Sequence, residues 1–150
     1  MMSKRQHVVN NGAAELALLV ADIYEAAGVL RRSGETIAGA EGQSQARWQL
    51  LSVISGGPIT VAQAARRLGV TRQGVQRVAN DLIDERLAVA GPNPDHRSSP
   101  LLELTPVGVA TLRRINDRAE EINAEIAKKL NPTTVARTRQ ALRALIDATP

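Results

Sequence analysis

The chain alternates between segments in which apolar residues recur every three or four positions and segments rich in glycine, proline and polar residues. Recurrence at that spacing places apolar side chains along one face of an α-helix. The first such segment predicts a helix from Gly12 to about Arg32, with a face made of Leu16, Leu19, Val20, Ile23, Ala27 and Leu30. The polar residues Met1 to Asn11 are interpreted as an arm, and the glycine-rich stretch from Ser33 to Gly42 predicts a break.

A second helix is predicted from about Gln43 to Ser55, where the same apolar spacing continues through Trp48, Leu51 and Ile54. The run Gly56-Gly57-Pro58 ends it, because a left-handed cap and a following proline belong after a helix.

Two short helices joined by a tight turn come next. Thr60 and Gln63 have the spacing of a capping box, which predicts a helix that starts at Val61. It should end near Leu68, because Gly69 can take the left-handed conformation. Thr71 can cap a following helix, so the turn between the two has about three residues and contains glycine. This arrangement is typical of a helix-turn-helix.

The second half of the chain predicts a hairpin and two more helices. Leu87 to Ala90 and Leu101 to Leu104 are strand-like runs on either side of a polar, turn-rich tip, which indicates a two-stranded wing. Thr105-Pro106 starts a helix that runs to about Lys129, and Asn131-Pro132 starts the last one. The predicted fold class is therefore mainly α, with a winged helix-turn-helix.

Composition agrees with a single helical domain of 150 residues, because 43% of the residues are hydrophobic but only 1% are aromatic. The absence of cysteine excludes disulfides, thiolate metal sites and thiol nucleophiles. His7 and His96 have no metal-binding spacing, and no nucleophile with a base or phosphate-binding loop is found, so we expect no metal, no cofactor and no enzyme activity. We also expect no membrane span and no signal peptide, and hence a cytoplasmic protein.

The positive charge is unevenly distributed. The net charge is +4, and no acidic residue interrupts the span from Thr60 to Asn80, which contains Arg66, Arg67, Arg72 and Arg77. A helix that is only solvated usually mixes both signs, whereas a surface that faces phosphates needs this segregation. The span therefore predicts a contact with duplex DNA.

The helix that follows Thr71 is the predicted recognition helix. Val75, Val78 and Leu82 should face the core, which leaves four polar side chains to project outward: Arg72, Gln73, Gln76 and Arg77. Arginine can read guanine and glutamine can read adenine in a major groove that admits a helix. The amide end that Thr71 caps could hold a phosphate.

Two positions have alternative interpretations. Gly74 either lets the helix backbone approach the groove closely or is an ordinary helix glycine. Arg97, at the hairpin tip, either enters a narrow minor groove or is a solvated loop charge.

Three runs form one pattern along the chain: Thr60-Val61-Ala62-Gln63-Ala64-Ala65-Arg66-Arg67-Leu68-Gly69-Val70-Thr71-Arg72 with Val75, Arg77 and Asp81-Leu82; Asp95-His96-Arg97; and Leu104-Thr105-Pro106-Val107-Gly108. Together they resemble the MarR family of winged helix-turn-helix regulators. The resemblance implies a homodimer whose dimerisation helices span about 12–42 and 106–150, around a DNA-binding lobe of about 43–105. It also implies a pseudo-palindromic operator and a pocket in which small aromatic acids or phenols weaken DNA binding.

The chain departs from the family pattern in three places. Asp95 to Thr105 is one residue longer than usual, so the register of the wing motif stays open between Asp95 and His96. Arg86 occupies the position where the family usually has glycine after the recognition helix. The first wing strand, from Ala88 to Ala90, has no basic residue.

These features favour a ligand-responsive repressor. Tyr24 and Trp48 are candidate walls of the effector pocket and Arg47 a candidate carboxylate partner, but core packing is the favoured role for Trp48 and a surface position the more common one for Arg47. The alternatives are a DNA-binding protein without an effector and a winged helix that serves only as a protein-interaction module.

Overall fold

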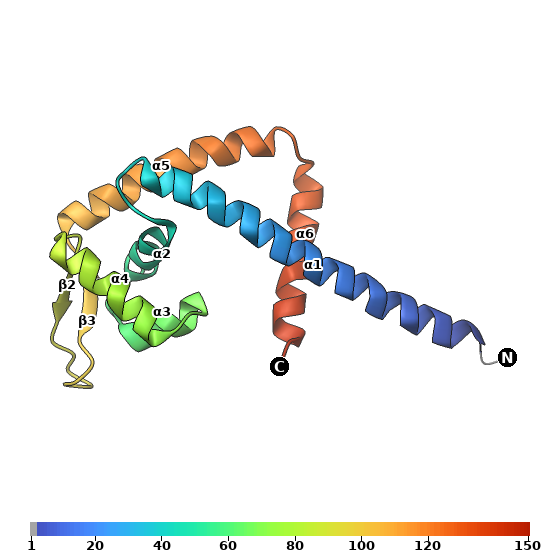
Figure 1. The fold of residues 1–150 in the computed structure, drawn as a ribbon, viewed down its shortest axis with the longest axis horizontal. Coiled ribbons are helices and arrows are strands. Elements are labelled where there is room, and N and C mark those ends of the chain that lie inside the picture. The colour runs from blue at the N-terminus through green and yellow to red at the C-terminus, as the bar shows by residue number, and fades with distance from the viewer. Residues whose placement is uncertain (1–2) are drawn as a thin grey trace.

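The computed structural model describes residues 3–150 and the side chains from residue 11 onward (Figure 1). Helices and strands follow one another as α1 (Ser3–Gly39), α2 (Gln45–Ile54), β1 (Ile59–Thr60), α3 (Val61–Leu68), α4 (Arg72–Asp84), β2 (Ala88–Gly91), β3 (Leu101–Leu104), α5 (Pro106–Ala127) and α6 (Pro132–Ala148). The mainly helical fold class is confirmed. Within residues 3–150, no helix combines the length and the apolar character that a membrane crossing requires.

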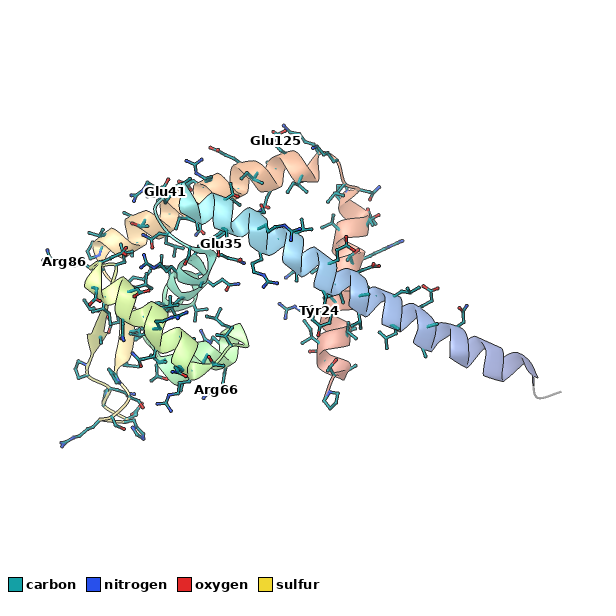
Figure 2. All side chains as sticks on the ribbon, viewed as in Figure 1. Tyr24, Glu35, Glu41, Arg66, Arg86 and Glu125 are labelled. Atoms are coloured by element: carbon teal, nitrogen blue, oxygen red, sulfur yellow. The ribbon has the colours of Figure 1, made fainter. Side chains whose placement is uncertain are left out.

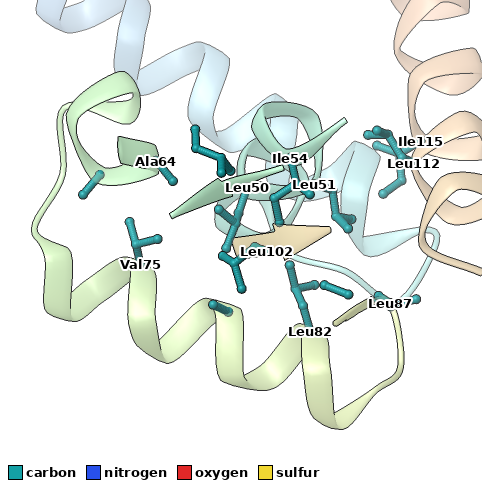
Figure 3. Close-up of a cluster of buried hydrophobic side chains, with 14 of the residues drawn as sticks. Leu50, Leu51, Ile54, Ala64, Val75, Leu82, Leu87, Leu102, Leu112 and Ile115 are labelled. Carbon is teal, nitrogen blue, oxygen red and sulfur yellow. The ribbon is translucent and has the colours of Figure 1, made fainter. Parts of the chain in front are cut away.

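A lobe made of α2, α3, α4 and the sheet lies against the end of α1 and the beginning of α5 (Figure 1). Its core is aliphatic, and the largest fully buried side chains are Leu50, Leu51, Leu82 and Ile115 (Figure 3). The other half of α1 extends away from the lobe, and α6 buries none of its residues in the chain. The lobe is therefore the packed part of the chain.

The predicted break between Ser33 and Gly42 is wrong, because α1 continues to Gly39. Ile37 and Ala38 are buried in or beside the core, and this packing outweighs the weak helix propensity of the glycines. The predicted N-terminal arm is also wrong from Ser3 onward, since the backbone there is helical; Met1 and Met2 lie outside the described residues. No proline interrupts this stretch, and Lys4, Arg5 and Gln6 have good helix propensity.

The helix-turn-helix is confirmed together with its capping residues. The Thr60 hydroxyl accepts from the Gln63 amide at 3.2 Å, and the Gln63 side chain accepts from the Thr60 amide at 3.0 Å. Gly69 takes the left-handed conformation, with φ of 65°, and ends α3. The Thr71 hydroxyl accepts from the Gly74 amide at 3.1 Å and so caps α4.

The wing has a third strand that the sequence analysis missed. β3 lies between β2 and β1 in an antiparallel sheet, with Ile59 opposite Leu102 and Thr60 opposite Leu101. The expectation of a two-stranded wing is corrected accordingly. A strand of two residues has no periodic pattern, so only its partner strand identifies it.

Arg86 adopts the left-handed conformation that glycine would take without strain, with φ of 60°. The Leu87 amide donates to the Leu82 carbonyl at 2.8 Å and the Arg86 amide to the Ile83 carbonyl at 2.9 Å, the two bonds of a Schellman motif. The motif therefore forms in spite of the non-glycine residue.

Candidate DNA-binding interface

The outer face of α4 carries the side chains that the sequence predicts for base reading. Arg72, Gln73, Gln76 and Arg77 are exposed, while Val75, Ala79 and Leu82 are buried and Val78 is partly buried. The orientation of the helix about its axis is therefore the predicted one. Core packing on one side fixes which residues can reach a groove on the other.

The positive charge of α3 and α4 is not neutralised by nearby carboxylates. Among residues 11–150, none of Arg66, Arg67, Arg72 and Arg77 is in an ion pair. The acidic residues at the end of α4 have another partner, since Arg47 of α2 lies 2.6 Å from Glu85 and 3.6 Å from Asp81. The four arginines remain available to a polyanion.

A cleft of about 170 Å³ separates α4 from the wing. Arg72, Gln76 and Asn80 line it on the helix side, and Ser98 and Ser99 on the wing side. Gln76 Nε2 donates to Asn80 Oδ1 at 2.9 Å, so the two amides form a pair on this flank of the helix. The sequence analysis missed Asn80, Ser98 and Ser99, although the i, i+4 spacing of Gln76 and Asn80 could have indicated the pair.

Asn93 shapes the tip of the wing. Its Nδ2 donates to the Ser99 carbonyl at 2.8 Å, and its Oδ1 accepts from the Asp95 amide at 3.0 Å. Beyond this turn, His96 Nδ1 lies 3.0 Å from the Ser98 hydroxyl, and Arg97 is exposed. The tip therefore presents Arg97 to solvent from a backbone that the Asn93 side chain holds.

Gly74 is next to the cap of its own helix. A Cβ added there would lie 3.0 Å from the Thr71 hydroxyl oxygen, which is tighter than most such contacts. The absence of a side chain thus leaves room for the capping hydroxyl, a reason that the sequence analysis did not consider. Whether the helix backbone also approaches a groove at Gly74 stays a prediction.

The three candidate pocket residues have three different neighbours. Tyr24 is 76% exposed in the middle of α1 (Figure 2). Trp48 packs against the core and its Nε1 donates to Asn116 Oδ1 of α5 at 2.9 Å. Arg47 points to the end of α4, so the single chain does not bring these side chains around one cavity.

Comparison with known proteins identifies the family. Residues 42–97 match the family model described as "MarR family", and this segment contains the helix-turn-helix, β2 and the first part of the wing tip. The chain belongs to the MarR family. This MarR-family protein is a DNA-binding transcription regulator rather than an enzyme.

The relatives of this MarR-family protein extend over almost the whole chain. It is 58% identical over 134 residues to an uncharacterized protein of Mycobacterium tuberculosis, which covers 89% of this chain and 94% of the relative. The crystal structure of a mutant MarR from E. coli complexed with operator DNA shares the fold, with a TM-score of 0.78, 20% identity and coverage of 87% and 95%. So does that of the PcaV transcriptional regulator from Streptomyces coelicolor in complex with its natural ligand, with a TM-score of 0.69, 20% identity and coverage of 81% and 89%.

Proposed function

We propose that the protein is a cytoplasmic repressor that binds a pseudo-palindromic operator as a homodimer and is released by a small aromatic or phenolic ligand. The DNA-binding part of this proposal rests on the exposed arginines of α3 and α4 beside the wing, which form no ion pair within residues 11–150. A structure of E. coli MarR with operator DNA has the same fold and supports this use of the surface.

The dimer is inferred from apolar faces that have no partner in the protomer. The stripe of α1 that includes the buried residues Ile37 and Ala38 continues toward the N-terminus through Leu30 and Val20 to Leu16, which are all exposed. Exposed apolar residues also occur on α6, among them Val135 and Ile146. A second copy that covers both helices would bury this surface, and the dimerisation segments 12–42 and 106–150 are therefore part of the proposal.

The DNA contacts divide into base reading and phosphate binding. Arg77, Gln73 and Gln76 project from the first two turns of α4 and would reach base edges in the major groove. Arg72 lines the cleft between α4 and the wing, where it would contact the sugar-phosphate backbone together with the end of α4 that Thr71 caps. Arg97 would enter the neighbouring minor groove.

The ligand response is supported by PcaV, which is described in complex with its natural ligand. In this chain, Tyr24 is too exposed to line a pocket of the protomer alone, so a pocket that includes it needs surface from the partner subunit. Trp48 and Arg47 belong to the same proposal as wall and carboxylate partner. A titration of the DNA complex with salicylate, which should weaken binding, tests it.

The central experiment measures DNA binding by fluorescence anisotropy across a salt series. The probe is a duplex that the protein enriches from a random-sequence library, and a scrambled duplex is the control. We expect the selected duplex to bind at least about 1,000-fold more tightly than the scrambled one. Arg77→Ala should lose about 10- to 100-fold in affinity for the selected duplex, and Arg72→Ala should also reduce the salt slope by about one.

A matched control is Arg113→Ala, which removes an exposed arginine of α5 outside this surface. It should leave the affinity within about twofold. Failure to enrich any sequence, with equal weak binding to all duplexes, would contradict the proposal and favour the protein-interaction alternative. Unchanged affinity under salicylate would instead favour a regulator without this class of effector.

A further inference from the structure

The turn between α1 and α2, residues 40–44, joins the long N-terminal helix to the DNA-binding lobe, and it is attached to α5 on one side. Glu41 Oε2 accepts from Arg114 Nε at 2.8 Å, and Glu41 Oε1 lies 3.8 Å from Arg118 Nη2. The Glu41 side chain is only 18% exposed. Arg114 also donates to the hydroxyl of the buried Thr111 at 3.1 Å, so its guanidinium is held at two points.

On the other side, Gln43 of the turn and Arg47 of the first turn of α2 are attached to the C-terminal end of α4. Arg47 Nη1 donates to Glu85 Oε1 at 2.6 Å, and Arg47 Nη2 lies 3.6 Å from Asp81 Oδ2. Gln43 joins the same group, since its Nε2 donates to Glu85 Oε2 at 3.4 Å and its Oε1 accepts from Arg47 at 3.4 Å. Arg47 is 20% exposed, and its planar guanidinium can engage two carboxylates at once in a way that lysine cannot.

We propose that Arg47 and Glu41 are positioning residues for operator binding: they fix the orientation of α4 relative to α1 and α5, and thereby the spacing of the two recognition helices in the dimer. The inference rests on the proposed function, because it needs both the homodimer and the α4 contacts. Neither side chain has to touch DNA. Arg47 and Gln43 bind the end of α4 and Glu41 binds α5, so residues 41–47 connect the two helices.

The geometry shows why a small change at this point matters. α4 has 13 residues and is therefore about 20 Å long at 1.5 Å per residue. A tilt of about 10° about its C-terminal end would move the first turn, which carries Arg72 and Gln73, by about 3.4 Å, one base-pair step. Because the operator presents two half-sites at a fixed spacing, such a shift would put the second recognition helix out of register with its bases.

Arg47 has a second effect on the recognition helix. Asp81 follows Arg77 by four residues, a spacing at which the two could form an ion pair. Asp81 instead lies beside Arg47, and within residues 11–150 Arg77 is in no ion pair. The interaction that holds the helix end thus also leaves Arg77 available for a base.

The test compares a full operator with a half-operator. The full probe is the selected duplex described above, and the half probe keeps one half-site and scrambles the other. For Arg47→Gln we expect the full-operator affinity to fall by about 10- to 100-fold and the half-operator affinity to stay within about twofold. The reason is that a misplaced second recognition helix meets the second half-site at a lower effective concentration, whereas binding of one half-site is unaffected. Glu41→Gln should behave in the same way.

Two controls separate positioning from folding and from direct contact. Asp81 and Glu85 are 48% and 45% exposed, so loss of Arg47 should leave thermal stability nearly unchanged. Arg113→Gln removes the same charge from α5 and should change neither probe. The reversed pair, Arg47→Glu with Glu85→Arg, should restore much of the full-operator affinity. If Arg47→Gln does not fold, Glu85→Gln removes the same interaction by changing its partner at the end of α4.

Equal losses on both probes would overturn the inference, because they would mean that Arg47 contacts DNA or supports the lobe. No loss on either probe would overturn it as well. If the wild-type protein enriches no sequence, the proposed function itself has failed, and that result is obtained before any variant is made.

Discussion

Replacing Gly108 with alanine tests the position at which α5 meets the base of the wing. A Cβ at residue 108 would lie 1.9 Å from the Leu87 carbonyl oxygen and 2.9 Å from the Leu87 carbonyl carbon. A carbon and an oxygen atom in contact need about 3.3 Å, so the carbonyl would have to withdraw by about 1.4 Å. That displacement would also break the hydrogen bond from the Thr105 amide to the Leu87 oxygen, which is 3.1 Å long.

The expected cost combines three effects. Overpacking costs about 1 to 3 kcal/mol and the lost hydrogen bond about 1 kcal/mol, while alanine recovers about 1 kcal/mol of helix propensity. A net loss of about 2 kcal/mol should lower Tm by about 4 to 8 °C for a chain of this size. The assay is thermal unfolding followed by circular dichroism at one fixed protein concentration, because the proposed dimerisation would couple Tm to concentration.

The control is Gly39→Ala, at the exposed end of α1, where an added Cβ meets no atom within 4 Å. It should leave Tm unchanged or slightly higher. A Gly108→Ala variant as stable as the wild type would refute the close approach of α5 to Leu87, and with it the packing that places α5 against the lobe.

Two further predictions concern backbone strain and assembly. Arg86→Gly should raise the free energy of unfolding by about 0.5 to 1 kcal/mol, because it removes the Cβ from a residue in the left-handed conformation. Arg86→Ala keeps the Cβ and should give no gain, so equal Tm values for the two variants would contradict backbone strain at this position. Leu19→Glu should convert the proposed dimer to monomers in light scattering, because it places a charge on the apolar stripe of α1. Ala21→Glu, on the opposite side of the helix, should not, and a Leu19→Glu dimer would show that this stripe is not the interface.

Sequence reasoning succeeded where the signals are local. The starts of α3, α4, α5 and α6 are each fixed by a capping side chain within three residues: Thr60, Thr71, Thr105 and Asn131. The exposed face of α4 follows from the period of the helix and the positions of its apolar residues. These parts of the fold and of the candidate surface could therefore be predicted from the chain alone.

The failures have in common that a distant segment decides the outcome. α1 continues through the glycine-rich stretch because Gly34 fits against the Gln45 side chain and Ile37 is buried in the core. β1 exists because β3, some 40 residues later, pairs with it. The interaction of Arg47 with the end of α4 spans a similar separation, so its neighbour in sequence, Trp48, suggested a different role for it.

The two ends of α4 are consequently supported in different ways. Its C-terminal end is held by long-range contacts, since Arg47 binds Glu85, and the Arg86 carbonyl accepts from the Thr105 hydroxyl at 2.7 Å. Toward its N-terminal end, the outward side chains proposed for base reading make one side-chain hydrogen bond within residues 11–150, from Gln76 to Asn80. Substitutions at Arg72, Gln73 or Arg77 should therefore change DNA affinity with little effect on stability, whereas changes at the other end alter the position of the whole reading face. This separation makes the half-operator comparison informative, because the proposed direct contacts and the proposed positioning contacts lie at opposite ends of one helix.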